Sequence, residues 1–155
     1  MTTKLYRPCV GICLINNQGR VFAGERIDTP NAWQMPQGGV DGGEDLERAA
    51  YRELLEEIGT DKAEIITLHP KPLTYDLPAD VASRLWNGEY AGQSQTWFYM
   101  RFTGQDSDIN LSAFDPPEFK QWLWMNAQEL KHKIVPFKID TYDAVLDYLT
   151  TSILD

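Results

Sequence analysis

Cysteine is scarce in this sequence, and it contains no long hydrophobic run. Cys9 and Cys13 are the only cysteines among 155 residues. In an extended strand they would lie about 13 Å apart, too far for a disulfide, so we expect small buried residues rather than ligands. No stretch reaches the roughly 18 apolar residues of a membrane span, and the start MTTKLYRPC lacks the apolar core of a secretory signal. We therefore expect a protein of the reducing cytoplasm that does not bind membranes.

Basic residues are also few, and acidic residues are concentrated in one segment. The chain has 14 Lys and Arg against 23 Asp and Glu, a net charge of −9. This balance argues against a broad nucleic-acid surface and against binding of a DNA duplex. Residues 41–57 alone contribute −5 of that charge, so the reason for the acidity is local.

The length predicts a single domain spanning 1–155, and the mixture of patterns predicts an α/β fold. We expect strands at 10–16, 20–27, 63–70, 72–78, 94–104 and 119–125, and a short extended piece at 33–36 followed by a glycine-rich loop. Helices are expected at 45–58, 78–86, 126–133 and near 139–153. Because strands and helices do not alternate strictly, the pattern predicts a central mixed sheet with helices on both faces.

The helix expected at 45–58 carries Glu53, Glu56 and Glu57 at spacings that share one face. Like charges at this spacing disfavour the helix, and its C-terminal dipole disfavours anions. Hard oxygen ligands held together are what Mg²⁺ or Mn²⁺ requires. The alternative is a solvated acidic face with Arg52 paired to Glu56 one turn on. The glutamates alone leave both interpretations open.

A glycine-rich stretch, GGVDGGE, directly precedes this helix. Gly38 and Gly39 permit close approach to a ligand and unusual φ values. The backbone carbonyl of one of them is a possible further ligand for a hard metal ion.

The combined spacing resembles the Nudix box, G-x5-E-x7-R-E-U-x-E-E-x-G-U, in which U is a bulky aliphatic residue. The matching positions are Gly38, Glu44, Arg52, Glu53, Leu54, Glu56, Glu57 and Gly59, and only Thr60 departs, at a packing position. The resemblance implies a Nudix hydrolase, with an α/β/α sandwich around a mixed sheet, that hydrolyses a nucleoside diphosphate linked to another group.

The same resemblance implies roles for individual residues. Glu53 and Glu57 become the main Mg²⁺ ligands, with Glu56 as a ligand or assisting carboxylate and the Gly38 carbonyl completing the shell. Arg52 positions Glu53 through an ion pair, and Glu44 supports the site. Glu118, in DPPEF, is the candidate for an additional base and metal ligand; the alternative is an ordinary loop acid.

Shorter motifs extend the similarity over roughly residues 5–150. YRPCVGICLIN, WQMPQGG, LTYDLP, GQSQTWF, PEFKQWLW and VPFK resemble a subgroup containing bacterial RNA 5′-pyrophosphohydrolases and diadenosine tetraphosphate hydrolases. The resemblance implies that Tyr75 and Phe137 stack a nucleobase; the alternative is that both are core aromatics.

Phosphate and polar contacts follow from the same subgroup. Arg7, Arg26 and Lys138 are candidate phosphate contacts, although each alone fits a solvated surface charge. Gln93 and Gln95 are candidates for hydrogen bonds to substrate, although strand alternation also allows one to face solvent. Thr96 stands where some relatives have lysine, which puts one basic contact in doubt.

Together these features predict a Mg²⁺-dependent enzyme, with Mn²⁺ as a possible substitute, that cleaves a 5′-linked polyphosphate chain. The substrate is triphosphorylated RNA, which yields 5′-monophosphate RNA and pyrophosphate, or diadenosine tetraphosphate, which yields ATP and AMP. The acidic balance favours the dinucleotide and the subgroup motifs favour RNA. The alternatives are a housecleaning nucleoside triphosphate pyrophosphohydrolase and a non-catalytic nucleotide-binding module. We expect a monomer.

Overall fold

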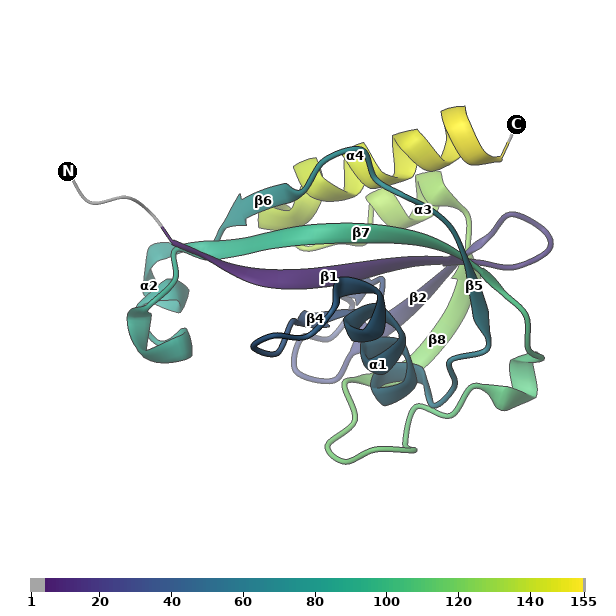
Figure 1. Ribbon diagram of the computed structural model, residues 1–155, viewed down its shortest axis with the longest axis horizontal. Coiled ribbons are helices and arrows are strands. Elements are labelled where there is room, and N and C mark those ends of the chain that lie inside the picture. Colours follow the sequence, from purple (N-terminus) through teal and green to yellow (C-terminus); the bar gives the residue numbers. More distant parts are fainter. Residues whose placement is uncertain (1–4, 155) are drawn as a thin grey trace.

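One mixed β-sheet forms the centre of the computed structural model, which describes residues 5–154 (Figure 1). β1 and β7 pair in parallel at its middle, and the other strand pairs are antiparallel. The order is β3-β2-β1-β7-β5, with β4 pairing β1, β6 pairing β7 and β8 pairing β2. The strands are β1 Tyr6–Ile15, β2 Val21–Arg26, β3 Trp33–Gln34, β4 Gln37–Gly39, β5 Ala63–Leu68, β6 Leu73–Asp76, β7 Gly92–Phe102 and β8 Phe119–Met125.

Helices cover both faces of this sheet, which confirms the predicted α/β/α sandwich (Figure 1). α1 packs on one face, and α3 and α4 pack on the other. In β1, Ile12 and Leu14 face α1, whereas Cys13 and Ile15 face α4, as the two-residue period of a strand requires. The helices are α1 Leu46–Ile58, α2 Ala79–Ala82, α3 Ala127–Lys131 and α4 Ile139–Tyr148, and a π-helical turn at Leu149–Ile153 continues α4.

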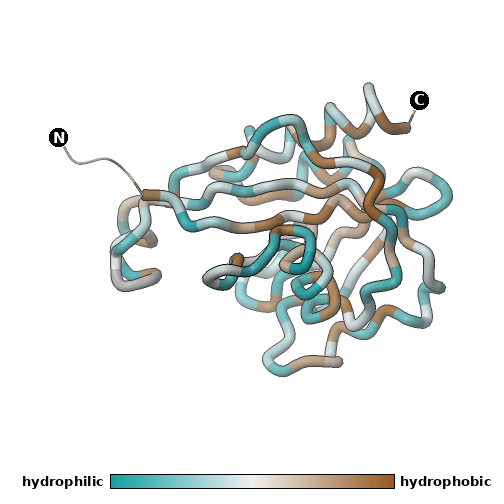
Figure 2. Tube along the Cα trace, viewed as in Figure 1, coloured by the Kyte–Doolittle hydropathy of each residue, from teal (hydrophilic) through white to brown (hydrophobic). Residues whose placement is uncertain are grey.

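The two apolar layers account for most of the buried side chains. Figure 2 shows hydrophobic segments gathered where the strands converge and hydrophilic residues along many of the outer loops. Cys9 and Cys13 are buried free thiols, as expected, and burial raises the pKa of Cys9 to about 11. None of the described helices is both long and apolar enough to cross a membrane.

Helix α1 begins and ends where the sequence predicts. The side chain of Asp45 accepts a hydrogen bond from the Arg48 backbone N–H, and Gly59 ends the helix with φ +81°. Thr60, the residue that departs from the box, is buried, and its hydroxyl accepts a bond from the Lys62 N–H at 3.2 Å. These caps fix which turn of the helix carries Glu53, Glu56 and Glu57.

Two expectations about the glycine-rich segment are wrong. Gln37–Gly39 is not loop but strand β4, because its backbone pairs with β1, with Gly38 opposite Val10. Gly38 and Gly39 have no left-handed φ; in this segment only Gly43 does, at +75°. A Cβ on Gly38 would lie 2.0 Å from the Glu53 carboxylate, so this glycine lets a side chain of the protein approach the β4 backbone; close approach of a ligand stays a prediction.

Candidate active site

The predicted glutamates line one pocket of about 520 Å³ beside the end of α1. Glu53, Glu56 and Glu57 come from α1, Gly38 from β4 and Glu118 from the loop before β8. Glu118 is 61 residues beyond Glu57 in sequence, yet its charge contributes to raising the pKa of Glu57. The structure therefore brings together all five predicted metal-site residues.

A second pocket of about 660 Å³ adjoins the first. Five of the seven predicted substrate-binding residues line it: Arg26, Tyr75, Gln93, Phe137 and Lys138. Arg26 and Gln37 line both pockets. These two side chains therefore mark the junction of the two pockets.

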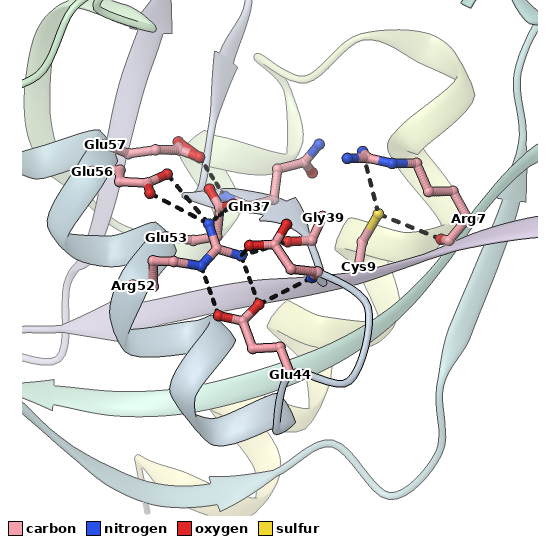
Figure 3. Close-up of polar contacts among 10 residues, drawn as sticks. Arg7, Cys9, Gln37, Gly39, Glu44, Arg52, Glu53, Glu56 and Glu57 are labelled. Atoms are coloured by element: carbon pink, nitrogen blue, oxygen red, sulfur yellow. Dashed lines mark hydrogen bonds and ion pairs between the residues drawn. The ribbon is translucent and has the colours of Figure 1, made fainter. Parts of the chain in front are cut away.

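Arg52 is the centre of an ion-pair network (Figure 3). Its guanidinium donates to both carboxylate oxygens of Glu44 at 2.7 and 2.8 Å, and to Glu53 Oε1 at 2.9 Å. It also lies 3.4 Å from Glu56 and donates to the Gly39 carbonyl at 2.9 Å. The predicted Glu53 pair and the alternative Glu56 pair thus exist together. Hydrogen bonding to Arg52 lowers the pKa of Glu44 to about 2, so Glu44 is an anchor for the arginine.

Glu57 is a buried carboxylate with one oxygen left without a partner. It is 5% exposed, and its Oε1 accepts a hydrogen bond from the Gln37 backbone N–H at 3.1 Å. Oε2 is the only buried side-chain oxygen or nitrogen among the described residues that lacks a hydrogen bond. Burial, and then the charge of Glu53, raises the pKa of Glu57 well above its usual range. Burial also raises the pKa of Glu53.

These residues fit a hard divalent cation. A cation would compensate the unpartnered Glu57 Oε2 and the repulsion between Glu57 and Glu53. The missing side chain of Gly38 leaves room for the Glu53 carboxylate beside the β4 backbone. In the part of the chain that the structure describes, no three His, Cys, Asp or Glu side chains already form a metal-binding cluster; Arg52 instead holds Glu53 and Glu56.

Tyr75 and Phe137 lie in contact, with ring centroids 5.7 Å apart at 38°. Tyr75 is mostly buried, whereas Phe137 is 37% exposed. In this arrangement there is no space for a base between the rings, because stacked aromatic planes would need a wider gap. Phe137 is the more exposed of the two rings and lines the second pocket, and stacking of a base stays a prediction.

The three predicted cations occupy different positions. Arg26 donates to both oxygens of Asp28 at 2.6 and 2.7 Å and to Gln34 Oε1 at 3.1 Å. Lys138 is 4% exposed, so it is not a solvated surface charge, and its Nζ donates to the same Gln34 oxygen at 3.1 Å. Burial, and then the charge of Arg26, lowers the pKa of Lys138 to about 8. Arg7 lies against Gly39, where a Cβ would be 2.1 Å from its Nη2.

Neither predicted glutamine of β7 faces solvent, so that alternative is wrong. Gln93 and Gln95 are two residues apart, on the same buried face of the strand. Gln95 accepts from the Trp97 indole and donates to Gln37 and Gln93 at 3.0 and 3.1 Å. Its bonds to protein groups therefore use its oxygen and both amide N–H groups.

Sequence reasoning missed Gln34 and Gln37 as individual site residues. Gln34 holds Arg26 and Lys138, and Gln37 lines both pockets. The segment WQMPQGG was recognised as a motif, and its position directly before Gly38 was the available signal. Lys138, a partner of Gln34, lies 104 residues away in sequence, and Gln95, the partner of Gln37, lies 58 residues away, so only the fold identifies these contacts.

Comparisons with known proteins agree with this geometry. The family model described as NUDIX domain matches residues 5–145. The RNA pyrophosphohydrolase of Wolbachia pipientis subsp. Culex pipiens (strain wPip) is 51% identical over 150 residues, covering 97% of this chain and 93% of that protein. The RNA pyrophosphohydrolase of Roseobacter denitrificans is 56% identical over 145 residues, covering 92% and 90%.

Solved structures share the fold at low sequence identity. An E. coli dihydroneopterin triphosphate pyrophosphohydrolase superposes with a TM-score of 0.73 at 19% identity, covering 96% of this chain and all of that one. A binary complex of a C. elegans Ap4A hydrolase superposes with a TM-score of 0.67, also at 19% identity, covering 93% and 98%.

Proposed function

This chain belongs to the Nudix family and is a hydrolase of pyrophosphate bonds; on that premise we propose that it is an RNA 5′-pyrophosphohydrolase. It converts 5′-triphosphorylated RNA into 5′-monophosphorylated RNA and pyrophosphate. The observation that carries the substrate is identity of about half over nearly the whole chain to RNA pyrophosphohydrolases. The paired pockets joined at Arg26 and Gln37 support it, since they offer a phosphate site beside a nucleoside site.

Nudix hydrolases generally need divalent metal ions, and we propose Mg²⁺, with Mn²⁺ as a substitute, held by Glu53, Glu57, Glu56 and the Gly38 carbonyl, with Glu118 nearby. When bound, the cation neutralises charge on the phosphoryl oxygens and makes water a better nucleophile. Residues of this chain hold the proposed ligands in position. Arg52 holds Glu53 and Glu56 in place, and the Gln37 N–H fixes Glu57.

Hydrolysis forms one water oxygen–phosphorus bond and breaks one phosphorus–oxygen bond of the anhydride. We propose that Glu118, which lines the first pocket, accepts the proton that the water loses. Arg26 and Lys138 bind phosphate oxygens near the pocket junction, with Arg7 on the β1 side. The exposed face of Phe137 stacks a base of the first nucleotides.

A second candidate substrate is diadenosine tetraphosphate. Phe114 lines the first pocket and is 45% exposed. The face of an aromatic ring does not stabilise a phosphate anion, whereas a nucleobase can stack on it. Phe114 therefore offers a stacking surface for a second nucleoside on the phosphate side of the site. Triphosphorylated RNA has no base at that end of its phosphate chain.

A competition assay in Mg²⁺ tests the proposal. Triphosphorylated trinucleotide RNA and diadenosine tetraphosphate are offered together, and the initial rates of pyrophosphate and ATP formation are followed. Predominant pyrophosphate with monophosphorylated RNA is the expected result. Predominant ATP and AMP would assign the dinucleotide instead, and faster hydrolysis of free nucleoside triphosphates would assign a housecleaning role. Lack of all three activities would leave a binding module. We further propose that the protein acts as a cytoplasmic monomer.

A further inference from the structure

A buried chain of amide side chains connects the sheet core to the junction of the two pockets. It begins at Trp97, whose indole N–H donates to Gln95 Oε1 at 3.0 Å. Gln95 Nε2 then donates to Gln37 Oε1 at 3.0 Å and to Gln93 Oε1 at 3.1 Å. The Tyr75 hydroxyl donates to the same Gln93 oxygen at 2.6 Å. Trp97 and Gln95 line neither pocket, whereas Gln37 lines both.

The indole of Trp97 determines which atoms donate and which accept in the hydrogen bonds of this chain. An indole nitrogen can only donate, so Gln95 must turn its carbonyl oxygen toward Trp97. Its NH₂ group then faces Gln37 and Gln93, and both must present their oxygens to it. Gln37 is therefore held with its amide NH₂ group directed away from Gln95. The amide orientation, which an isolated glutamine leaves open, is fixed by hydrogen-bond chemistry.

The anchor of this chain is rigid. Trp97 is fully buried and packs edge-on against Tyr142, with ring centroids 5.8 Å apart. Gly11 on the neighbouring strand makes room for the indole, because a Cβ there would lie 2.5 Å from its ring atoms. The indole therefore cannot rotate to release Gln95 without repacking the core.

We propose that Gln37 is a substrate-contacting donor, held by Gln95 and Trp97 so that its NH₂ group binds a phosphate oxygen at the junction of the two pockets. This inference rests on the proposed function and names a contact within it. Gln95 is then a positioning residue, which revises its predicted role as a direct contact. One N–H of Gln37 reaches toward Tyr75, whose pKa the contact lowers against a larger rise from burial. The second N–H serves the substrate, because the amide nitrogen carries two.

The matching partner at the junction is a phosphate oxygen rather than a donor group. Arg26, the other residue common to both pockets, brings a positive charge to the same place. Lys138, close enough to Arg26 for its pKa to respond to that charge, adds another. An NH₂ group beside two cations selects an anionic acceptor. In triphosphorylated RNA, the phosphate that joins the anhydride chain to the first ribose supplies it.

A double-mutant cycle on Gln37 and Gln95 tests this arrangement. Gln37→Met keeps side-chain length and removes the donor, so KM for a triphosphorylated trinucleotide should rise about tenfold with little change in kcat. Gln95→Glu keeps an acceptor for Trp97 but cannot donate when ionised. Gln37 must then turn its own oxygen toward the substrate, and KM should rise further than in Gln37→Met. Gln95→Met, which merely releases Gln37, should give a smaller rise.

The decisive comparison is the effect of the Gln95 variants when Met replaces Gln37. If Gln95 acts through Gln37, Gln95→Glu and Gln95→Met should then change KM less than about twofold. Equal effects in both backgrounds would overturn the proposal, as would an unchanged KM in Gln37→Met. Gln95→Met keeps the cycle usable if Gln95→Glu does not fold. Gln18→Met, in the exposed turn at 16–19, is the matched control and should leave KM and kcat unchanged.

Binding separates this inference from the proposed function. The same variants are titrated with a trinucleotide whose 5′-triphosphate carries methylene bridges, and Kd should follow the order expected for KM. Wild-type protein that binds the analogue but releases no pyrophosphate from RNA would refute the proposed function alone. Wild-type protein that releases pyrophosphate while the cycle shows no coupling would refute the inference alone. Failure of the analogue to bind at all would overturn both.

Discussion

At the scale of single residues, Glu57 is a proposed metal ligand whose burial carries an energetic penalty. It is buried with one oxygen unpartnered, and its pKa is raised well above its usual range. A raised carboxyl pKa means that the folded state prefers the protonated form, so the contribution is favourable at low pH. That contribution is lost as pH rises through the folded-state pKa. At neutral pH and without metal, Glu57 should therefore reduce stability.

We expect Glu57→Gln to abolish Mg²⁺-dependent pyrophosphate release while raising the free energy of unfolding by about 1–3 kcal/mol at neutral pH. The amide can still accept from the Gln37 N–H but carries no buried charge. Urea unfolding in EDTA between about pH 5 and pH 8 measures this, and the gain over wild type should grow with pH. A variant that keeps full activity, or one less stable than wild type at pH 8, would contradict the assignment.

The ammonium group of Lys138 should lose its charge within the pH range in which the enzyme can be assayed. Its pKa is lowered to about 8 by burial and by Arg26, against the opposing charges of Glu57 and Asp28. If Lys138 binds phosphate as an ammonium, KM for triphosphorylated RNA should rise several-fold between about pH 7 and pH 9 as the charge is lost. Lys138→Met should raise KM at the lower pH and remove that dependence. A wild-type KM that stays flat over this range would exclude Lys138 as a phosphate contact.

At the scale of elements, α1 could be predicted from sequence because its signals are local. Glutamates at helical spacing and a glycine directly after them predict the helix, and the structure confirms it, with Asp45 as a further local signal at the N-cap. Strand β4 could not be predicted, because Gln37, Gly38 and Gly39 show no strand pattern of their own. Their conformation depends on β1, which lies 28 residues earlier where Gly38 meets Val10.

A substitution of Gly59, which ends α1, tests how much these local helix signals contribute to stability. Gly59 has φ +81°, and a Cβ there would lie 2.4 Å from the Asn110 carbonyl. Gly59→Ala should lower the free energy of unfolding by about 1–3 kcal/mol, from left-handed strain and displacement of the 110 segment. Gly42 and Gly43, in the loop before the same helix, supply two matched controls. Gly43→Ala, with φ +75° in open space, should show the strain alone, and Gly42→Ala, with neither feature, should be neutral.

Urea unfolding of the three variants separates the two contributions. Equal losses for Gly59→Ala and Gly43→Ala would mean that the Asn110 contact carries no energy. A neutral Gly59→Ala would show that the helix does not need its left-handed cap.

At the scale of the whole molecule, the sequence predicts which residues belong to the site better than it predicts what they contact. The box residues are fixed by their spacing along one continuous segment, from strand β4 through a short loop to the end of α1. Gln34, Gln37 and the Trp97–Gln95 chain depend on side chains that the sheet brings together from β2, β3, β4 and β7. The subgroup resemblance predicts that Gln95 contacts substrate, but the sequence does not show that Trp97 and Gln37 are its partners.

Charge is the property of the whole molecule that limits the RNA footprint. The protein carries −9 overall, and the predicted phosphate contacts are only Arg7, Arg26 and Lys138. Three contacts to single-stranded RNA predict a log–log slope of kcat/KM against salt of about −2 or shallower. KM should also stay constant from about three nucleotides upward, since an acidic surface gives longer RNA nothing more to bind.

Arg26→Gln should reduce the salt slope of kcat/KM by about 0.7, whereas Lys71→Gln, outside both pockets, should leave that slope unchanged. A slope several times steeper, or a KM that falls steadily with RNA length, would reveal an extended binding surface and contradict recognition confined to the 5′ end.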